Sequence, residues 1–173
     1  MNKQLVSILM GSDSDLTIMN EAGKALDALG VGYEITVASA HRSPDLVVEH
    51  VKNALQQGVK VFIAGAGGAA HLAGVVAALT SLPVIGVPIQ AKSLDGLDSL
   101  LSMVQMPQGV PVATVGIDSA FNAGILATQI LAVSNSELTA RLGDYKKSLA
   151  EGVVQKATKL KELGVEQYLQ AKK

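Results

Sequence analysis

The chain of 173 residues carries 14 basic and 15 acidic residues, and it contains no cysteine. This length suits one domain, and the formal net charge of −1 excludes nucleic-acid and membrane-surface proteins, because both partners require a concentrated basic face. The lack of cysteine removes disulfides, Cys-zinc sites and thiol nucleophiles together. Hydrophobic residues make up 49% and aromatic residues 3%, so we expect a core of Val, Leu, Ile and Ala.

Short apolar runs alternate with helical patterns along the first 135 residues. Five strands are predicted, at residues 5–10, 33–37, 59–64, 83–87 and 111–117. Helices are predicted at residues 16–29, 45–57, 69–79, 94–103 and 120–133. Repeated strand–helix units form right-handed crossovers and a parallel sheet. We therefore predict an α/β protein, a flavodoxin-like three-layer α/β/α sandwich with a parallel five-stranded sheet.

The strongly charged segment 137–173 follows the last of these units. Its apolar residues recur at spacings of three and four, which predicts a helix with one apolar stripe formed by Leu138, Leu142, Tyr145, Leu149 and Val153. The pattern leaves two arrangements open, in which the stripe packs on a neighbouring subunit or the helix folds back on its own sheet. We treat residues 1–173 as one domain, with a core of about 1–135 and this helical extension.

No apolar run reaches the length of a membrane span, and Met1 leads almost directly into a predicted strand. No signal-peptide pattern occurs there. We therefore expect a cytoplasmic protein that does not associate with a membrane.

A histidine and an arginine stand together after the second predicted strand, in the run SAHRSP at residues 39–44. Ser43 is expected to cap the next helix, and Pro44 suits its first turn. His41 and Arg42 therefore project from the carboxyl end of a strand, where open α/β sheets bind their ligands. The pair joins a titratable imidazole to a fixed cation, which favours an anionic substrate.

The run GSDSD at residues 11–15 follows the first predicted strand. A glycine for a tight turn, two hydroxyls and free helix N–H groups would hold an anion such as phosphate. Alternatively, Ser14 or Asp15 only caps the helix. Asp13 and Asp15 also suggest a metal site, but carboxylates near Arg42 are better explained as its partners or as acceptors for sugar hydroxyls, so we expect no metal.

The run AGAGGAAH at residues 64–71 follows the third predicted strand. Its small residues would let a flat ligand approach the backbone closely, and its spacing also resembles a dinucleotide fingerprint ending at Ala70. His71 is expected one turn into the next helix, as a structural histidine or a ligand contact. His50, beside Glu49 in mid-helix, is expected on the solvated surface.

The strand order 2-1-3-4-5 of a flavodoxin-like sheet would bring these loops together. The loops with Ser12 and Gly67 would face each other across one crevice, with His41 and Arg42 at its side. A fourth run, QMPQG at residues 105–109, would form a lid or a rim. The residues alone thus predict a small phosphorylated substrate and histidine acid–base chemistry without metal or thiol.

Together these runs resemble the class I N5-carboxyaminoimidazole ribonucleotide mutase family of bacterial purine biosynthesis. The resemblance rests on residues 11–15, 39–42, 64–72 and 104–107 and spans about residues 5–135. It implies an isomerase that moves a carboxylate from the exocyclic nitrogen to a ring carbon of aminoimidazole ribonucleotide, by releasing and recapturing carbon dioxide. It further implies no cofactor, a homo-octamer whose C-terminal helix packs on a neighbour, and an ATP-dependent synthetase that supplies the substrate.

The resemblance also assigns roles to residues. His41 matches the catalytic histidine, and Asp15 matches the residue that binds the ribose hydroxyls. Contacts to the substrate, mainly around its phosphate, match Ser12, Ser14, Ser39 and Arg42. The wall around the aminoimidazole and its carboxylate matches Gly67, His71 and Leu72. A small apolar pocket that retains carbon dioxide would be lined by Ala66, Gly67, Ala69 and Ala70.

Two positions depart from the family's usual residues, because Ser43 replaces threonine and Ala73 replaces proline. Ser43 keeps the hydroxyl, whereas Ala73 frees a backbone that proline would stiffen. Two other functions fit parts of the pattern. Class II enzymes share the fold and the histidine and carboxylate aminoimidazole ribonucleotide directly. A non-catalytic flavin- or nucleotide-binding module would use the same fold but leaves the pair His41 and Arg42 unexplained.

Overall fold

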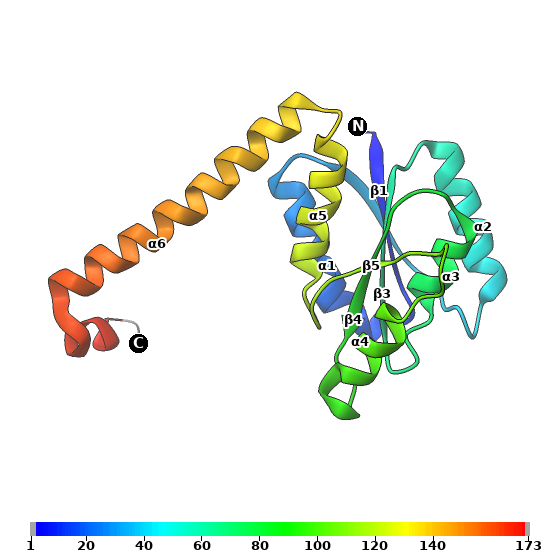
Figure 1. Cartoon of the computed structure of the whole chain (residues 1–173), viewed down its shortest axis with the longest axis horizontal. Coiled ribbons are helices and arrows are strands. Elements are labelled where there is room, and N and C mark those ends of the chain that lie inside the picture. Colours follow the sequence, from blue (N-terminus) through cyan, green and yellow to red (C-terminus); the bar gives the residue numbers. More distant parts are fainter. Residues whose placement is uncertain (1–2, 172–173) are drawn as a thin grey trace.

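A computed structural model describes residues 3–171 and shows a parallel sheet between two layers of helices (Figure 1). The strands are β1 (Gln4–Met10), β2 (Gly32–Val37), β3 (Val61–Gly67), β4 (Val84–Ile89) and β5 (Ala113–Thr114). Their order is β2-β1-β3-β4-β5, and every neighbouring pair is parallel. The predicted flavodoxin-like three-layer sandwich is confirmed.

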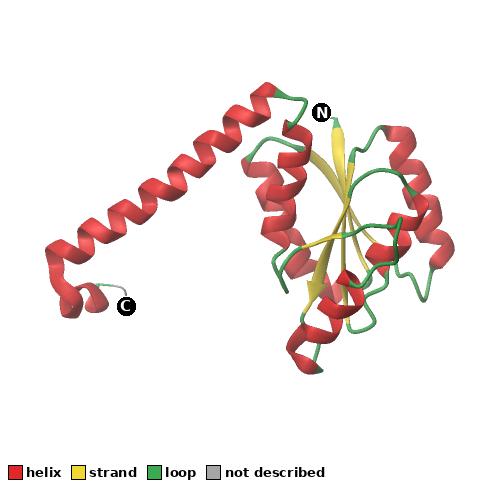
Figure 2. Ribbon diagram, in the orientation of Figure 1, coloured by secondary structure: helices red, strands yellow, loops and turns green. Residues whose placement is uncertain are grey.

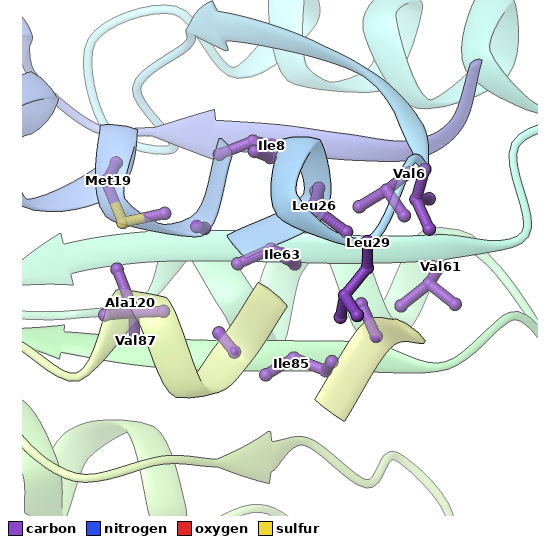
Figure 3. Packing of buried hydrophobic residues seen from close by; sticks show 14 of the residues in the cluster. Val6, Ile8, Met19, Leu26, Leu29, Val61, Ile63, Ile85, Val87 and Ala120 are labelled. Atoms are coloured by element: carbon purple, nitrogen blue, oxygen red, sulfur yellow. The ribbon is translucent and has the colours of Figure 1, made fainter. Parts of the chain in front are cut away.

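Helices cover both faces of the sheet (Figure 2). One face carries α1 (Leu16–Ala28) and α5 (Ala120–Ala132), and the other carries α2 (Pro44–Gln57), α3 (Leu72–Leu79) and α4 (Leu97–Val104). Alternate residues of each central strand enter opposite cores, so that Ile8 and Ile63 lie under α1 and α5 (Figure 3) while Leu9 and Phe62 lie under α2 and α3. Burial on both faces explains why these strands read as continuous apolar runs.

The bounds of the predicted elements shift by up to three residues in the structure, and three of these shifts have a local cause. The strand predicted at residues 111–117 is reduced to β5, because this edge strand pairs only with β4 and the chain turns at Asp118, whose φ is 56°. The helix predicted from residue 69 begins at Leu72, since Gly68 has a left-handed φ of 63°. A 3-10 turn, η2 (Leu94–Gly96), precedes α4 because all three of its residues have positive φ.

The last helix, α6 (Ser136–Gln170), starts on the sandwich and then projects far from it (Figure 1). Leu138 and Leu142 are buried against the α1/α5 core, whereas Leu149 and Val153 are 54% and 65% exposed. The start of the apolar stripe therefore folds back on its own domain, and the remainder lies uncovered. No helix within residues 3–171 has the length and apolar character of a membrane span.

The contact between α1 and α5 depends on small residues. A Cβ added at Gly124 of α5 would lie 2.6 Å from the carbonyl oxygen of Ala22 and 2.8 Å from the Cβ of Ala25, both in α1. Backbone atoms cannot swing aside as a flexible side chain can. The two helices therefore approach at a distance that only glycine permits at position 124.

Gly124→Ala is therefore expected to lower the free energy of unfolding by about 1–3 kcal/mol, because the methyl group forces α5 away from α1. The matched control is Gly143→Ala in α6, where an added Cβ meets nothing within 4 Å. That substitution should be neutral or stabilise by up to about 1 kcal/mol through helix propensity. Urea unfolding of both variants measures the difference, and equal effects would contradict the packing argument.

Candidate active site

A cavity of about 260 Å³ lies where β1, β2 and β3 end. Its lining comes from three loops that are far apart in sequence: Gly11, Ser12, Ser14, Asp15, Ser39, Ala40, His41, Arg42, Ala66, Gly67, Ala69 and Leu72. The strand order places β1 between β2 and β3, so the loops that follow these strands meet. The structure thus brings together every predicted site residue except His71, which contacts His41 instead.

Two serines close the loop that carries His41 and Arg42. The Ser39 amide donates to the Ser43 hydroxyl oxygen at 3.0 Å, and the Ser43 hydroxyl lies 3.2 Å from the Ser39 carbonyl oxygen that it donates to. Ser43 occupies the N-cap position of α2, but its side chain makes no bond to the helix amides. The predicted side-chain cap is wrong, because this hydroxyl bonds the loop backbone.

The Arg42 guanidinium bridges two of the three loops. Its Nη2 donates to the Gly11 carbonyl at 2.9 Å, and its Nε lies 3.4 Å from the Ser39 hydroxyl oxygen. No carboxylate within residues 3–171 forms an ion pair with Arg42. The expected pairing of this cation with Asp13 or Asp15 is therefore absent among the described residues, and its positive charge faces the cavity without an opposing carboxylate.

The first loop is capped by Ser12. The Ser14 amide donates to the Ser12 hydroxyl oxygen at 3.4 Å at the start of the 3-10 turn η1 (Asp13–Asp15). The predicted caps Ser14 and Asp15 are wrong, since the Ser14 hydroxyl donates to Asp15 Oδ1 at 3.0 Å and Asp15 makes no cap bond. Within residues 3–171 no group of three or more His, Cys, Asp or Glu side chains could hold a metal ion.

Burial raises the pKa of the Asp15 carboxyl above its usual range. The hydrogen bond from Ser14 opposes this shift, whereas the negative charges of Asp13 and Asp118 add to it. Asp118 lies in the loop after β5 and accepts a hydrogen bond from the Gln90 amide at 2.8 Å. Burial thus disfavours the ionised carboxylate of Asp15 in the unliganded protein. Hydrogen bonds donated by ligand hydroxyls would stabilise that carboxylate, so Asp15 is suited to accept them.

His41 forms a pair with His71. His41 Nε2 and His71 Nδ1 are 2.8 Å apart, and the two rings are nearly perpendicular at 80°. His71 occupies the N-cap position of α3, directly before the helix and not one turn into it. One proton serves an N–H···N hydrogen bond, so one ring donates and the other accepts. The presence or absence of a hydrogen on His71 Nδ1 therefore determines whether His41 Nε2 accepts or donates in this contact.

The third loop gives the cavity its apolar wall of Ala66, Gly67 and Ala69. Ala70, expected in the same wall, is 1% exposed and packs inside the core under α2 and α3. Its amide and that of Gly68 are held by two hydroxyls of α4 that the sequence analysis missed, those of Ser102 and Ser99. The available signal was their spacing of three, which places both hydroxyls on one side of the predicted helix.

Two further expectations are wrong. The His50 side chain is only 16% exposed, and its Nε2 lies 2.7 Å from the buried Ser7 hydroxyl of β1, because the inner face of α2 places it over that strand. Segment 105–109 contributes no residue to the cavity lining. Instead, Met106 lies over α3, where a Cβ added at Gly74 would be 3.2 Å from its sulfur.

Fold and cavity together define a flavodoxin-like α/β protein with an anion-type site at the switch point of its sheet. The model of the AIR carboxylase family matches residues 5–152, and the chain belongs to that family. This membership favours an enzyme over a flavin-binding module.

Individual relatives resemble most of the chain. The N5-carboxyaminoimidazole ribonucleotide mutase of Pyrococcus horikoshii is 56% identical over 167 residues, which are 96% of this chain and 94% of that protein. The phosphoribosylaminoimidazole carboxylase of Candida glabrata is 51% identical over 170 residues, 98% of this chain but 30% of that protein. The crystal structure of a substituted PurE2 from Treponema denticola is similar with a TM-score of 0.85 at 30% identity, over 93% of this chain and 99% of that one.

Asp15→Asn is expected to raise the thermal stability of the unliganded protein at pH 7. A raised native pKa means that ionising Asp15 removes stability as the pH rises through that pKa, and an amide never ionises. The gain should disappear below about pH 4, where the wild-type carboxyl is protonated in both states. Thermal unfolding at both pH values, with the exposed Asp144→Asn of α6 as control, tests this; an unchanged or lower Tm at pH 7 contradicts it.

Proposed function

We propose that this chain catalyses the conversion of N5-carboxyaminoimidazole ribonucleotide to 4-carboxy-5-aminoimidazole ribonucleotide, as an isomerase of de novo purine synthesis. Its full-length relative carries the name of this activity. The structural observation that carries the proposal is the convergence of His41, the unpaired Arg42 and the Ser12 loop on one small cavity. That combination supplies a proton carrier and an anion site within reach of one small molecule.

The substrate phosphate is assigned to the polar side of the cavity. Arg42 offers a charge-assisted donor pair, and hydroxyl donors come from Ser12, Ser14 and Ser39. The Asp15 carboxylate lines the same cavity and accepts hydrogen bonds from the ribose hydroxyls. The aminoimidazole ring then extends toward Gly67 and Leu72, where the absence of a side chain at Gly67 leaves room for a flat ring.

His41 is assigned to both proton transfers. In the first step the bond between the exocyclic nitrogen and the carboxylate carbon breaks, carbon dioxide leaves and the nitrogen receives a proton. In the second step the ring carbon forms a C–C bond to carbon dioxide and gives up its own proton. The proton donated in one step is recovered in the other, so no oxidant, reductant or second substrate is consumed. One histidine can serve both steps because an imidazole that has given up its proton as an acid can take one back as a base.

Two neighbouring features support this role. The hydrogen bond between His41 and His71 restricts the orientation of the His41 ring, which would otherwise be free on an exposed loop. The apolar wall of Ala66, Gly67 and Ala69 offers carbon dioxide no nucleophile and limits the entry of water. Carbon dioxide therefore stays beside the ring carbon that recaptures it.

Direct carboxylation of aminoimidazole ribonucleotide is the second candidate, because a 51% identical relative is named a carboxylase. The two activities are distinguished by their substrates. Purified protein should convert N5-carboxyaminoimidazole ribonucleotide without ATP or added bicarbonate. Conversion only of aminoimidazole ribonucleotide with carbon dioxide would replace the mutase assignment with the carboxylase one.

We also propose that the active unit is a homo-oligomer, with the octamer implied by the resemblance as its form. The exposed Leu149 and Val153 support this, because their own domain does not cover them. A second copy of the chain would bury this part of the apolar stripe. A phosphorylated ribonucleotide does not cross a bilayer readily, so the enzyme works in the cytoplasm, beside the ATP-dependent synthetase that would make its substrate.

His41→Asn should retain binding of aminoimidazole ribonucleotide and lose conversion by at least about 10²–10⁴-fold, because asparagine fills similar space but cannot carry the proton. The matched control is His50→Asn, which alters a histidine bonded to Ser7 away from the cavity. Calorimetry measures binding and absorbance measures conversion. Near-normal turnover in His41→Asn would overturn the assignment of the proton carrier.

Replacing Leu149 and Val153 together by glutamine should reduce the number of subunits measured by light scattering, because polar side chains weaken a buried apolar contact. Leu138 and Leu142 stay in place, so the start of α6 remains packed on its own core. The control replaces the exposed Lys147 and Glu151 of the same helix by glutamine. An unchanged subunit number in the first variant would show that this part of α6 connects no subunits.

A further inference from the structure

We propose that Ser99 of α4 is a positioning residue for the reaction, because its hydroxyl sets the backbone geometry of the glycine-rich loop that walls the cavity. The expected effect on the reaction rate rests on the proposed function. Its structural part rests only on hydrogen bonds between α4, β4 and the loop.

The Ser99 hydroxyl has a partner both as a donor and as an acceptor. Its oxygen accepts from the Gly68 amide at 2.7 Å, and its single proton is donated to the Ile89 carbonyl at 2.8 Å. The side chain is fully buried, at 0% exposure, so water cannot replace either partner. Ile89 ends β4, next to Gly67 at the end of β3. The hydroxyl thus joins a strand end, a helix and the cavity wall in one fixed arrangement.

Ser102, one turn further along α4, holds the other side of the same loop. Its hydroxyl oxygen accepts from the Ala70 amide at 3.3 Å, and the hydroxyl donates to the Gly68 carbonyl at 3.1 Å. Its proton has a second acceptor, the Asp98 carbonyl at 2.8 Å. Because one proton cannot serve both carbonyls fully, Ser102 constrains the loop less than Ser99 does.

The loop's own backbone bonds run from the Ala70 amide to the Gly68 carbonyl at 2.9 Å and from the His71 amide to the Ala69 carbonyl at 2.8 Å, and neither holds the Gly68 amide. Gly68 has a φ of 63°, the next two residues are alanines, and α3 begins only at Leu72. Gly67 has no side chain, so the part of it that lines the cavity is the peptide backbone itself. Rotation of the peptide between Gly67 and Gly68 would change the cavity wall and shift His71, the partner of His41. The Ser99 hydroxyl opposes that rotation by holding the Gly68 N–H.

Ser99→Ala is expected to lower kcat by about 10- to 100-fold, the loss typical of misplaced reacting groups, with less than about threefold change in KM. The split arises because the phosphate-side residues lie on the other two loops, which α4 does not hold. Ser102→Ala should lower kcat only several-fold. The matched control is Ser7→Ala, which removes another fully buried hydroxyl, bonded to His50 and remote from the loop; its stability should fall while kcat stays within about twofold.

Amide hydrogen exchange provides a readout that does not depend on activity. The Gly68 amide should be protected in the wild type and lose protection in Ser99→Ala, but keep it in Ser7→Ala. Loss of that protection with an unchanged kcat would overturn the positioning role, and retained protection would overturn the hydrogen-bond assignment. Absence of conversion by the wild type would instead overturn the proposed function and leave the exchange result standing.

Discussion

The parallel pairing of β1 with both β2 and β3 is the constraint on which the rest of this molecule depends. It aligns Met10 with Val37 on one side and with Gly65 on the other, so β1 and β2 end at one level and β3 ends two residues beyond it. The register continues past the strand ends, since the Gly11 amide donates to the Gly65 carbonyl at 3.2 Å. A slip by one residue would reverse the facing of a whole strand and separate the loops. The cavity is therefore a property of the sheet register.

Backbone groups and small hydroxyls then hold the loops at this edge. Arg42 reaches the Gly11 carbonyl, Ser43 closes its own loop, and Ser99 holds the Gly68 amide. Each contact satisfies polar backbone that regular secondary structure does not pair. The arrangement is rigid where the wall must be defined, and it leaves the Arg42 charge and the Asp15 carboxylate directed to a ligand. The raised pKa of Asp15 shows that this readiness lowers the stability of the unliganded fold.

The apolar residues of α6 are buried at the start of the helix and exposed further along it. Its first turns contribute Leu138 and Leu142 to the α1/α5 core, and Arg141 donates to the Leu29 carbonyl at 2.8 Å, which fixes where the helix leaves the sandwich. Tyr145 still packs on this core, but beyond it Leu149 and Val153 are each more than half exposed. In the proposed homo-oligomer a second copy would contact this helix, and the stability of α6 would then depend on assembly.

The sequence by itself determined the alternation of strands and helices, the three site loops and the adjacency of a histidine and an arginine, because continuous apolar runs, glycine turns and proline positions act locally. It predicted the buried strands well and the edge strand β5 poorly, since an edge has one partner and less apolar patterning. Only the tertiary structure decided the bond between His41 and His71, the burial of His50 and Ala70, the capping by Ser12 and the support from Ser99. Apart from the Ser12 cap, these depend on contacts between residues 30 or more positions apart or on the exact rotation of a helix, and local pattern carries no information about either.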